Sequence, residues 1–292
     1  MTDLKRLKSE HVLSTQLIAS VPRSLNDVFG AHDRLVVAVS GGVDSLTLAW
    51  AASVQPDLKL TVIHAAGPAV PPSATARVRE HARRGAWDLQ VLDAGEYQNP
   101  EYRRNPVNRC YFCKNNLYQR IGEATHANTA IAAGTNLDDL GEYRPGLIAA
   151  DEHEVIHPFV DAGMNKQAVR SLAAALGLDD IAQLPAQPCL ASRVETGIPI
   201  DANDLAFIDE VERVISDLLG PGDVRCRLTH EGVWLEVDSA VDVESVHGPM
   251  RRRCEESGRT FAGVRPYRRG SAFLTTKADE RVLEIHRAGR VR

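Results

Sequence analysis

The sharpest chemical signal in the sequence is a polar loop that follows an apolar run. Residues 36–39 are Val-Val-Ala-Val, and Ser-Gly-Gly-Val-Asp-Ser follows directly at residues 40–45. Glycines let the backbone turn tightly and approach a phosphate, while backbone amides and serine hydroxyls donate hydrogen bonds to its oxygens. We therefore expect a pyrophosphate site, although the loop is no Walker A motif. The residues expected to bind there are Ser40, Gly41, Gly42, Asp44 and Ser45, with Asp44 as the carboxylate for Mg²⁺.

A second polar turn follows another apolar run, at residues 129–133. Gly-Thr-Asn at 134–136 is continued by two acids, and such a turn is by itself often only a capped turn. Its place at a strand end favours contact with the nucleotide or its metal. The residues expected to take part are Gly134, Thr135, Asn136 and Asp138.

Cysteines supply the third chemical signal. Cys110 and Cys113 form a C-x-x-C pair, and Cys189 follows 76 residues after Cys113. Thiolates in this arrangement suit an iron–sulfur cluster, a zinc site or a redox pair, and the residues alone leave these three open. Cys226 and Cys254 lie outside such motifs, so we expect both to be small core residues.

The elements that position these residues follow from the apolar pattern. Strand-like runs alternate with helical periodicity in units of about 30 residues or more, which predicts a doubly wound parallel α/β sheet. Ligands of such sheets lie beyond the carboxyl ends of the strands. The expected strands are 34–39, 59–64, 89–92 and 129–133, and the expected helices between and after them are 44–52, 73–87 and 113–127. Asn165 is expected to cap a further helix that Gly177 ends.

The pattern changes after about residue 197. Helical periodicity at 204–219 and 241–257 surrounds alternating runs at 224–228 and 233–237, and a strand is expected at 259–264. This pattern predicts a smaller α+β domain. We therefore expect a nucleotide-binding domain at residues 1–196 and a second, substrate-binding domain at residues 197–292.

Composition sets broad limits. The 292 residues include 34 Lys and Arg against 39 Asp and Glu, and the formal net charge of −5 argues against binding nucleic acid mainly through charge. No apolar run approaches the roughly 20 residues of a membrane span. The charged first ten residues do not resemble a secretory signal, so a cytoplasmic protein without a membrane partner is expected.

The loop at 40–45 resembles the SGGxDS loop of the PP-loop ATP pyrophosphatases, an adenine nucleotide alpha hydrolase-like superfamily. The resemblance implies cleavage of ATP between its α- and β-phosphates, with transfer of AMP to a substrate oxygen. A nucleotide-sensing module without turnover is the non-enzyme alternative. Such a module has no need of three placed cysteines.

Three further motifs make the resemblance more specific. They are C-Y-F-C-K at 110–114, G-T-N-x-D-D-x-G-x-Y-R-P-G at 134–146 and C-L-A-S-R at 189–193, and with the Y-R-x-G-S at 267–271 they are similar to the LarE family. That family comprises ATP-dependent sulfur transferases of nickel-pincer nucleotide cofactor biosynthesis. The loop at 64–68 departs from it, because the serine expected there is absent.

The resemblance implies a sulfur source. The three-cysteine kind of LarE holds a [4Fe–4S] cluster, which here assigns Cys110, Cys113 and Cys189 as its ligands. A single-cysteine kind surrenders the sulfur of its C-L-A-S-R cysteine, so a sacrificial Cys189 is the alternative. Another PP-loop enzyme that thiolates tRNA or a small metabolite is the remaining enzyme alternative.

Basic residues complete the expected site. Arg225 and Arg227 share one face of a predicted strand, which suits bidentate binding of phosphate or carboxylate, though a solvated surface pair is the plainer alternative. Arg269, with its neighbour Arg268, is expected to add to this substrate pocket, with ordinary surface charge as the alternative. Lys114 and Arg193 adjoin proposed cysteine ligands and are expected to act on the adenylate phosphate or near the cluster. The implied partner is a small nicotinate-derived substrate, and a homo-oligomer is expected.

Overall fold

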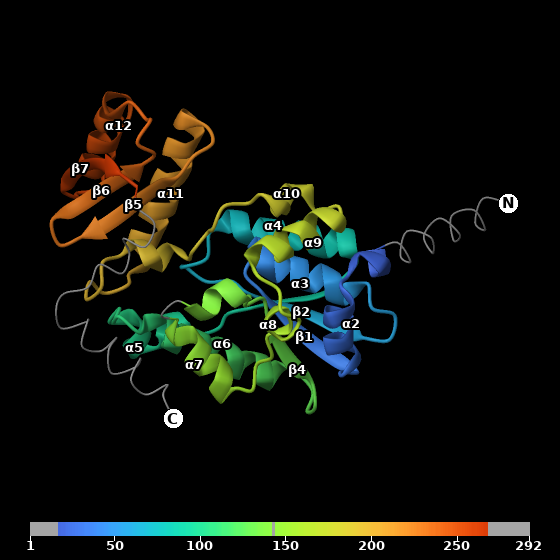
Figure 1. Cartoon of the computed structure of the whole chain (residues 1–292). Helices are drawn as coiled ribbons and strands as arrows, with labels where there is room; N and C mark the ends of the chain where they lie inside the picture. The colour runs from blue at the N-terminus through green and yellow to red at the C-terminus, as the bar shows by residue number, and fades with distance from the viewer. Residues whose placement is uncertain (1–16, 142–143, 268–292) are drawn as a thin grey trace. The chain divides into compact units, whose positions relative to one another are not determined.

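The computed structural model describes residues 17–141 and 144–267, which form two compact units (Figure 1). The first unit comprises the chain up to Gly67 together with Pro72–Gly95 and Cys110–Gln187. The second unit comprises Pro68–Pro71, Glu96–Arg109 and the chain from Pro188 onward. The domain boundary expected after residue 196 stays a prediction.

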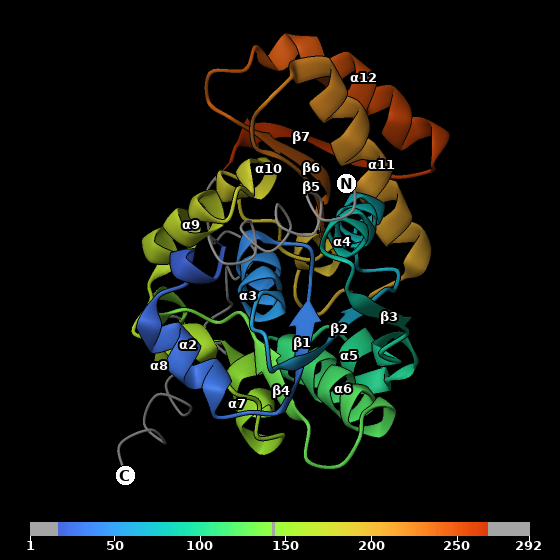
Figure 2. The same ribbon diagram turned by 90° about the vertical axis from the view of Figure 1, so that its right-hand side faces the viewer.

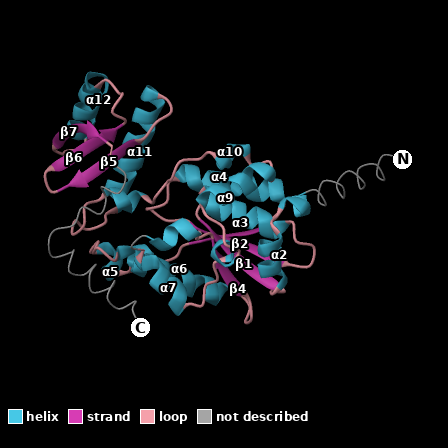
Figure 3. Cartoon of the chain, in the orientation of Figure 1, coloured by secondary structure: helices cyan, strands magenta, loops and turns pink. Residues whose placement is uncertain are grey.

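The first unit is built on a parallel four-stranded sheet in the order β3-β2-β1-β4, shown as one of two strand groups in Figure 3. The expected doubly wound parallel sheet is confirmed. Val39 pairs with His64 and Ala38 pairs with Ala133, so three strands end at the same edge. The strands are β1 (Arg34–Val39), β2 (Lys59–Ala65), β3 (Asp88–Leu92) and β4 (Ala130–Ala133).

Helices cover both faces of this sheet (Figure 1). Because side chains alternate along a strand, Leu35 and Val37 of β1 join one core, while Val36 joins the other. The first core includes α2 (Arg23–Gly30), α3 (Val43–Ser53), α4 (Pro72–Gly85), α8 (Pro158–Asp161), α9 (Lys166–Ala175) and α10 (Asp179–Ala182). The second core includes α6 (Arg109–Ala124) and α7 (Pro145–Glu152). A 3-10 turn, η2 (Leu137–Gly141), follows β4.

Local signals place several helix ends where the sequence predicts them. Asn165 caps α9, since its side-chain oxygen accepts a hydrogen bond from the Ala168 amide at 2.9 Å. Gly177 follows this helix with a φ of +71°, a conformation that glycine adopts without steric cost. The helix expected at 113–127 instead begins at Arg109 and ends at Ala124. It begins early because the chain already turns at Pro106, whose carbonyl accepts from the Arg109 amide.

The second unit contains a three-stranded sheet with two longer helices. Strand β5 pairs antiparallel with β6, and β6 pairs parallel with β7. The elements of this unit are η1 (Glu96–Gln98), α5 (Pro100–Arg103), η3 (Leu190–Arg193), α11 (Ala202–Leu219), β5 (Val224–Thr229), β6 (Gly232–Val237), α12 (Val243–Glu256) and β7 (Phe261–Pro266). Figure 2 shows α11 and α12 together beside these strands. Strand β7 begins two residues later than expected because the Arg259 amide still closes the end of α12, on the Cys254 carbonyl.

Candidate functional site

The loop between β1 and α3 is closed by its own serines. The hydroxyl oxygen of Ser45 accepts a hydrogen bond from the Ser40 amide at 3.1 Å and donates to the Gly42 carbonyl at 3.2 Å. Gly41 has a φ of +84°, and a Cβ there would lie 2.8 Å from the Ala74 carbonyl oxygen. Only glycine therefore fits at residue 41. Gly42 caps α3, so the amides of the first helical turn are directed toward the loop.

The second strand-end motif lies directly against this loop. A Cβ on Gly134 would come within 2.9 Å of the Ser45 amide nitrogen, so the end of β4 and the start of α3 touch. Asn136, which is buried, donates from its side chain to Asp44 at 3.2 Å. The structure thus brings together two sets of residues that the sequence places about 90 positions apart. Thr135 lies between Gly134 and Asn136 and is half-buried.

Lys166 is a basic residue of this site that sequence reasoning missed. Its Nζ lies 2.5 Å from Oδ2 of Asp44, and its backbone amide donates to the Asp138 side chain at 3.2 Å. Both contacts arise because α9 begins at Lys166. The available signal was the position of the lysine, immediately after the predicted cap Asn165 at the start of a helix.

His64 fixes the end of β2 next to the loop. Its Nδ1 lies 2.9 Å from the Val39 carbonyl and its Nε2 lies 2.9 Å from the Thr75 hydroxyl. A carbonyl can only accept, so Nδ1 carries the proton and Nε2 accepts from Thr75. Burial lowers the pKa of His64, outweighing the Val39 carbonyl, which raises it. A neutral histidine thus holds β1, β2 and α4 together.

The C-x-x-C pair occupies the first turn of α6. Cys110 and Cys113 are three residues apart, a spacing that places side chains on one helix face, and both thiols are half-buried and outside any disulfide. Lys114 follows, with its Nζ 5.7 Å from the centre of the Tyr118 ring. A Cβ on Gly146 would lie 3.0 Å from Cγ of Lys114, so the start of α7 packs closely on this turn.

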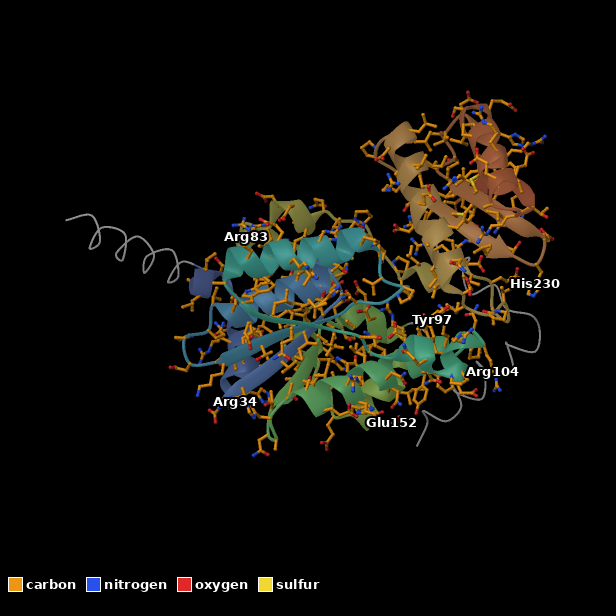
Figure 4. The ribbon with its side chains drawn as sticks, turned by 180° about the vertical axis from the view of Figure 1, so that it is seen from behind. Arg34, Arg83, Tyr97, Arg104, Glu152 and His230 are labelled. Atoms are coloured by element: carbon orange, nitrogen blue, oxygen red, sulfur yellow. The ribbon has the colours of Figure 1, made fainter. Side chains whose placement is uncertain are left out.

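Tyr111, between the two cysteines, ties the same turn to the end of α7. Its hydroxyl donates to the Glu152 carboxylate at 2.8 Å, and Glu152 is labelled in Figure 4. This bond raises the pKa of Tyr111, because loss of the phenolic proton would place two negative charges side by side. The tyrosine therefore acts as a hydrogen-bond donor that holds α6 on α7.

Cys189 belongs to the second unit and begins a short turn. The Ser192 amide donates to the Cys189 carbonyl at 2.9 Å, and the Leu190 amide donates to the Ala69 carbonyl at 2.8 Å. Arg193 closes the turn, since its Nη1 donates to the Pro188 carbonyl at 2.7 Å. The backbone around Cys189 is thus held by bonds on three sides.

Arg193 is itself held by the carboxylate of Glu212, whose side chain is 14% exposed. Its Nε and Nη2 donate to the two oxygens of Glu212 at 2.9 and 3.0 Å, a bidentate pair. Burial lowers the pKa of Arg193, but the bond to Glu212 and the negative charge beside it outweigh burial and raise the pKa overall. In this structure the guanidinium serves to fix the turn that carries Cys189.

A buried asparagine clamps the chain before Cys110 to the chain after Cys189. Asn105 is fully buried with a φ of +54°, and its Nδ2 donates to the carbonyls of Glu195 at 2.8 Å, Ile198 at 2.9 Å and Val194 at 3.3 Å. The guanidinium of Arg109 donates to its side-chain oxygen. Arg109 directly precedes Cys110 in the sequence, and Val194 directly follows the C-L-A-S-R turn. We call these contacts the Asn105 clamp.

The two expected substrate arginines lie on β5 and are both engaged within the second unit. Arg225 contacts Asp223 at 3.0 Å and lies over the Tyr267 ring. Arg227 donates to the buried Glu236 at 2.6 Å and to the Ser192 carbonyl at 3.1 Å. Arg227 and Arg193 therefore meet at the Cys189 turn. Arg269 lies outside the described residues.

The remaining cysteines are buried as expected. Cys226 and Cys254 have no exposed surface, and burial raises the pKa of both thiols, that of Cys226 well above the usual value. Both are therefore protonated packing residues at neutral pH.

No group of three or more His, Cys, Asp or Glu side chains is arranged to hold a metal ion within residues 17–141 and 144–267. The three candidate cysteine ligands belong to both units, with Cys110 and Cys113 in the first and Cys189 in the second. Among the helices of the described chain, none is long and apolar enough to cross a membrane.

The fold and the loop define a class. A parallel sheet whose first strand ends in Ser-Gly-Gly-Val-Asp-Ser, with helices on both faces, is a Rossmann-like domain of the PP-loop kind. No family model matches the chain.

Three curated proteins are similar to the chain. An uncharacterized protein of Synechocystis sp. is 35% identical over 72% of this chain and 79% of its own length. An uncharacterized protein of Methanocaldococcus jannaschii is 27% identical over 67% of the chain and 74% of its own length. Pyridinium-3,5-bisthiocarboxylic acid mononucleotide synthase of Lactiplantibacillus plantarum is 26% identical over 71% of this chain and 75% of its own length. The chain belongs to one family with the Synechocystis protein, and it is similar to a LarE-type synthase.

Proposed function

We propose that the protein is an ATP-dependent sulfur transferase of nickel-pincer nucleotide cofactor biosynthesis. Its substrate would be a pyridinium dicarboxylate mononucleotide, and its products a thiocarboxylate, AMP and pyrophosphate. The name of the Lactiplantibacillus relative supports this class of substrate. The observation that carries the proposal is the Asn105 clamp, because it joins the chain leading into the C-x-x-C pair to the chain leaving Cys189. A nucleotide-binding module without sulfur chemistry has no need of that link.

The loop at residues 40–45 suits the triphosphate of ATP. Gly42 adds no side chain at the start of α3, and the first amides of this helix offer donors and a favourable helix dipole. Asp44 is the residue that would hold Mg²⁺, and its carboxylate already binds the Lys166 ammonium, so the site accepts a cation there. Lys166, beside that carboxylate, is placed to neutralise the negative charge of the leaving pyrophosphate.

Cys110, Cys113 and Cys189 would hold a [4Fe–4S] cluster, for which three thiols outside any disulfide are the appropriate donors. When bound, such a cluster keeps one iron open and supplies the sulfide for transfer. The chain's own part is to fix the thiols: α7 packs on the turn of Cys110 and Cys113, and Arg193 holds the turn of Cys189. Lys114 and Arg193 add positive charge beside these thiols.

The reaction has two steps. An oxygen of the substrate carboxylate attacks the α-phosphorus, the bond to pyrophosphate breaks, and an acyl adenylate forms. Sulfide then attacks the acyl carbon, the bond to AMP breaks, and a thiocarboxylate remains. Arg225, Arg227 and Arg269 would bind the substrate's phosphate and second carboxylate. A homo-oligomer remains part of the proposal, and light scattering coupled to gel filtration measures it.

Anaerobic purification followed by iron and sulfide analysis, with a visible spectrum, tests the cysteine centre. We expect cluster absorption that Cys110→Ala, Cys113→Ala and Cys189→Ala each abolish, while Cys254→Ala, which alters a packing cysteine, retains it. A colourless, iron-free wild type whose Cys189 loses its sulfur after one turnover, as seen by mass spectrometry, would replace the cluster with a sacrificial cysteine. Pyrophosphate release that does not depend on a pyridine carboxylate contradicts the proposed substrate.

A further inference from the structure

Arg77 is a cation beside the phosphate loop that the proposed reaction does not yet use. It lies in the second turn of α4, and its Nη1 donates to the Gly41 carbonyl at 2.7 Å. The same nitrogen donates to the side-chain oxygen of Gln187 at 3.1 Å. All three residues belong to the first unit. One guanidinium therefore connects the Ser40–Ser45 loop to the last residue of that unit.

Both acceptors of Arg77 are uncharged. Within the described parts of the chain, no carboxylate lies within ion-pair distance of its guanidinium. Burial lowers the pKa of Arg77, and the negative charge of Asp180 opposes this only from a distance. Arg83 of the same helix differs, since it pairs with Glu80 at 2.8 Å and is 74% exposed. Among the described residues, Arg77 thus has no ion-pair partner at the loop, and only the more distant Asp180 offsets its charge.

The Arg77 guanidinium also has N–H donors that are not engaged by the described residues. An arginine has five N–H groups, of which Nη1 supplies two. Those two account for Gly41 and Gln187, while Nη2 and Nε make no hydrogen bond to the residues that the structure describes. These two nitrogens form the planar edge that binds phosphate in a bidentate manner. The side chain is therefore anchored at one nitrogen and has its recognition edge available.

We propose that Arg77 binds the phosphates of the nucleotide that leave as pyrophosphate and reports their presence to the segment before Cys189. This inference rests on the proposed function, since it requires ATP at the Ser40–Ser45 loop. Bidentate binding of phosphate by Nη2 and Nε fixes the guanidinium, and the bond from Nη1 then holds Gln187. Cys189 follows Gln187 by two residues, so an occupied loop steadies the chain that leads to the sulfur-bearing turn.

Titration calorimetry with ATP, AMP and inorganic pyrophosphate tests the binding half. We expect Arg77→Gln to weaken ATP and pyrophosphate about ten- to a hundredfold, the effect of losing charge-assisted hydrogen bonds, and to leave AMP unchanged. Arg77→Lys keeps the charge without the planar edge, so its affinities for ATP and pyrophosphate should lie between those of the wild type and Arg77→Gln. The matched control is Arg83→Gln, which alters an exposed arginine of the same helix (labelled in Figure 4) and should bind all three as the wild type does.

Hydrogen–deuterium exchange of the peptide spanning residues 183–189 tests the coupling. We expect ATP, but not AMP, to slow exchange there in the wild type. Gln187→Ala removes only an exposed acceptor, so it should fold normally and bind ATP, yet lose this slowing. Because this variant leaves the Ser40–Ser45 loop intact, it tests the coupling between bound ATP and residues 183–189 even if Arg77→Gln fails to fold.

The outcomes separate the two proposals. A wild type that binds no ATP overturns both the proposed function and this inference. A wild type that binds ATP while Arg77→Gln and Arg77→Lys bind it equally tightly overturns the inference alone and makes Arg77 a purely structural latch. ATP-dependent slowing that persists in Gln187→Ala removes the link to Cys189.

Discussion

The phosphate loop and the Cys189 turn use charged side chains in opposite ways. At the loop, Asp44 and Lys166 face each other while about a quarter to a third of each side chain stays exposed. At the turn, Arg193 is 5% exposed and Glu236, which binds Arg227 and Arg265, is 2% exposed. The loop therefore keeps polar groups available for a ligand. The turn uses its charges to hold a backbone in place.

This difference changes which basic residues matter for binding. Arg193 and Arg227, which the sequence marks for adenylate and substrate, each also bind a carboxylate of their own unit. Lys166 and Arg77 lie at the loop but belong to none of the sequence motifs. A charged residue in a motif can thus also hold the backbone, while a cation outside any motif can lie beside a motif loop.

Breaking the buried pair at the turn should have the largest effect. Arg193→Met leaves the half-buried Glu212 carboxylate without its charge partner, and it should lower the free energy of unfolding by about 3 kcal/mol. Urea unfolding measures this, with Arg83→Met on exposed α4 as the control, for which we expect almost no change. Equal stability of Arg193→Met and the wild type would show that the turn does not depend on this pair.

The Asn105 clamp should come next. Asn105→Ala removes one side-chain donor that three backbone carbonyls share and places alanine at positive φ, which should cost about 2–4 kcal/mol. Asn128→Ala is the matched control, because Asn128 has a φ of +69° but is exposed. That control should lose less than about 1 kcal/mol. Similar losses of unfolding free energy in the two variants would show that Asn105 matters for its positive φ and not for its side-chain hydrogen bonds.

Replacing Lys166 should slow the reaction while leaving the stability of the fold nearly unchanged. Lys166→Ala should slow substrate-dependent pyrophosphate release about ten- to a hundredfold, because the leaving charge loses a cation. The unfolding free energy should change by less than about 1 kcal/mol, since the ion pair with Asp44 is partly exposed. Lys59→Ala, at the opposite end of β2, should affect neither. A large stability loss with unchanged release kinetics would place Lys166 with the structural charges of the Cys189 turn.

The smallest effect expected is a pH dependence that arises from buried histidines of the first unit. Burial lowers the pKa of His64, His81 and His157, so the unfolded chain binds more protons than the folded chain below about pH 6.5. Stability is then complete above that pH and falls as the pH drops through this window, by at most about 1.4 kcal/mol per pH unit for each histidine. His64→Gln should flatten the slope of urea unfolding measured from pH 7.5 to 5.5. His230→Gln, on an exposed side chain (Figure 4), should leave it unchanged.

The sequence predicted the sheet well because its signals are local. Strand β1 is where the apolar run places it, and the end of α11 at Leu219 agrees with the predicted helix. Parallel pairing then brings Gly134 to Asp44 without further information. The Asn105 clamp and the Lys166 contact could not be predicted, since each joins residues 90 or more positions apart through a single side chain. The roles of Arg193 and Arg227 depend on burial beside Glu212 and Glu236, which no local pattern records.

The clamp also sets an order of events during synthesis. Asn105 bonds to Glu195, 90 positions later, so the ribosome must produce that stretch before the clamp can form. At about 5–20 residues per second this takes roughly 5 to 18 seconds. Throughout that interval the segment that precedes Cys110 has made none of its bonds to residues 194–198. The nascent chain therefore contains the Ser40–Ser45 loop and β4 before its Cys189 turn, so the Asn105 clamp is a late contact of the fold.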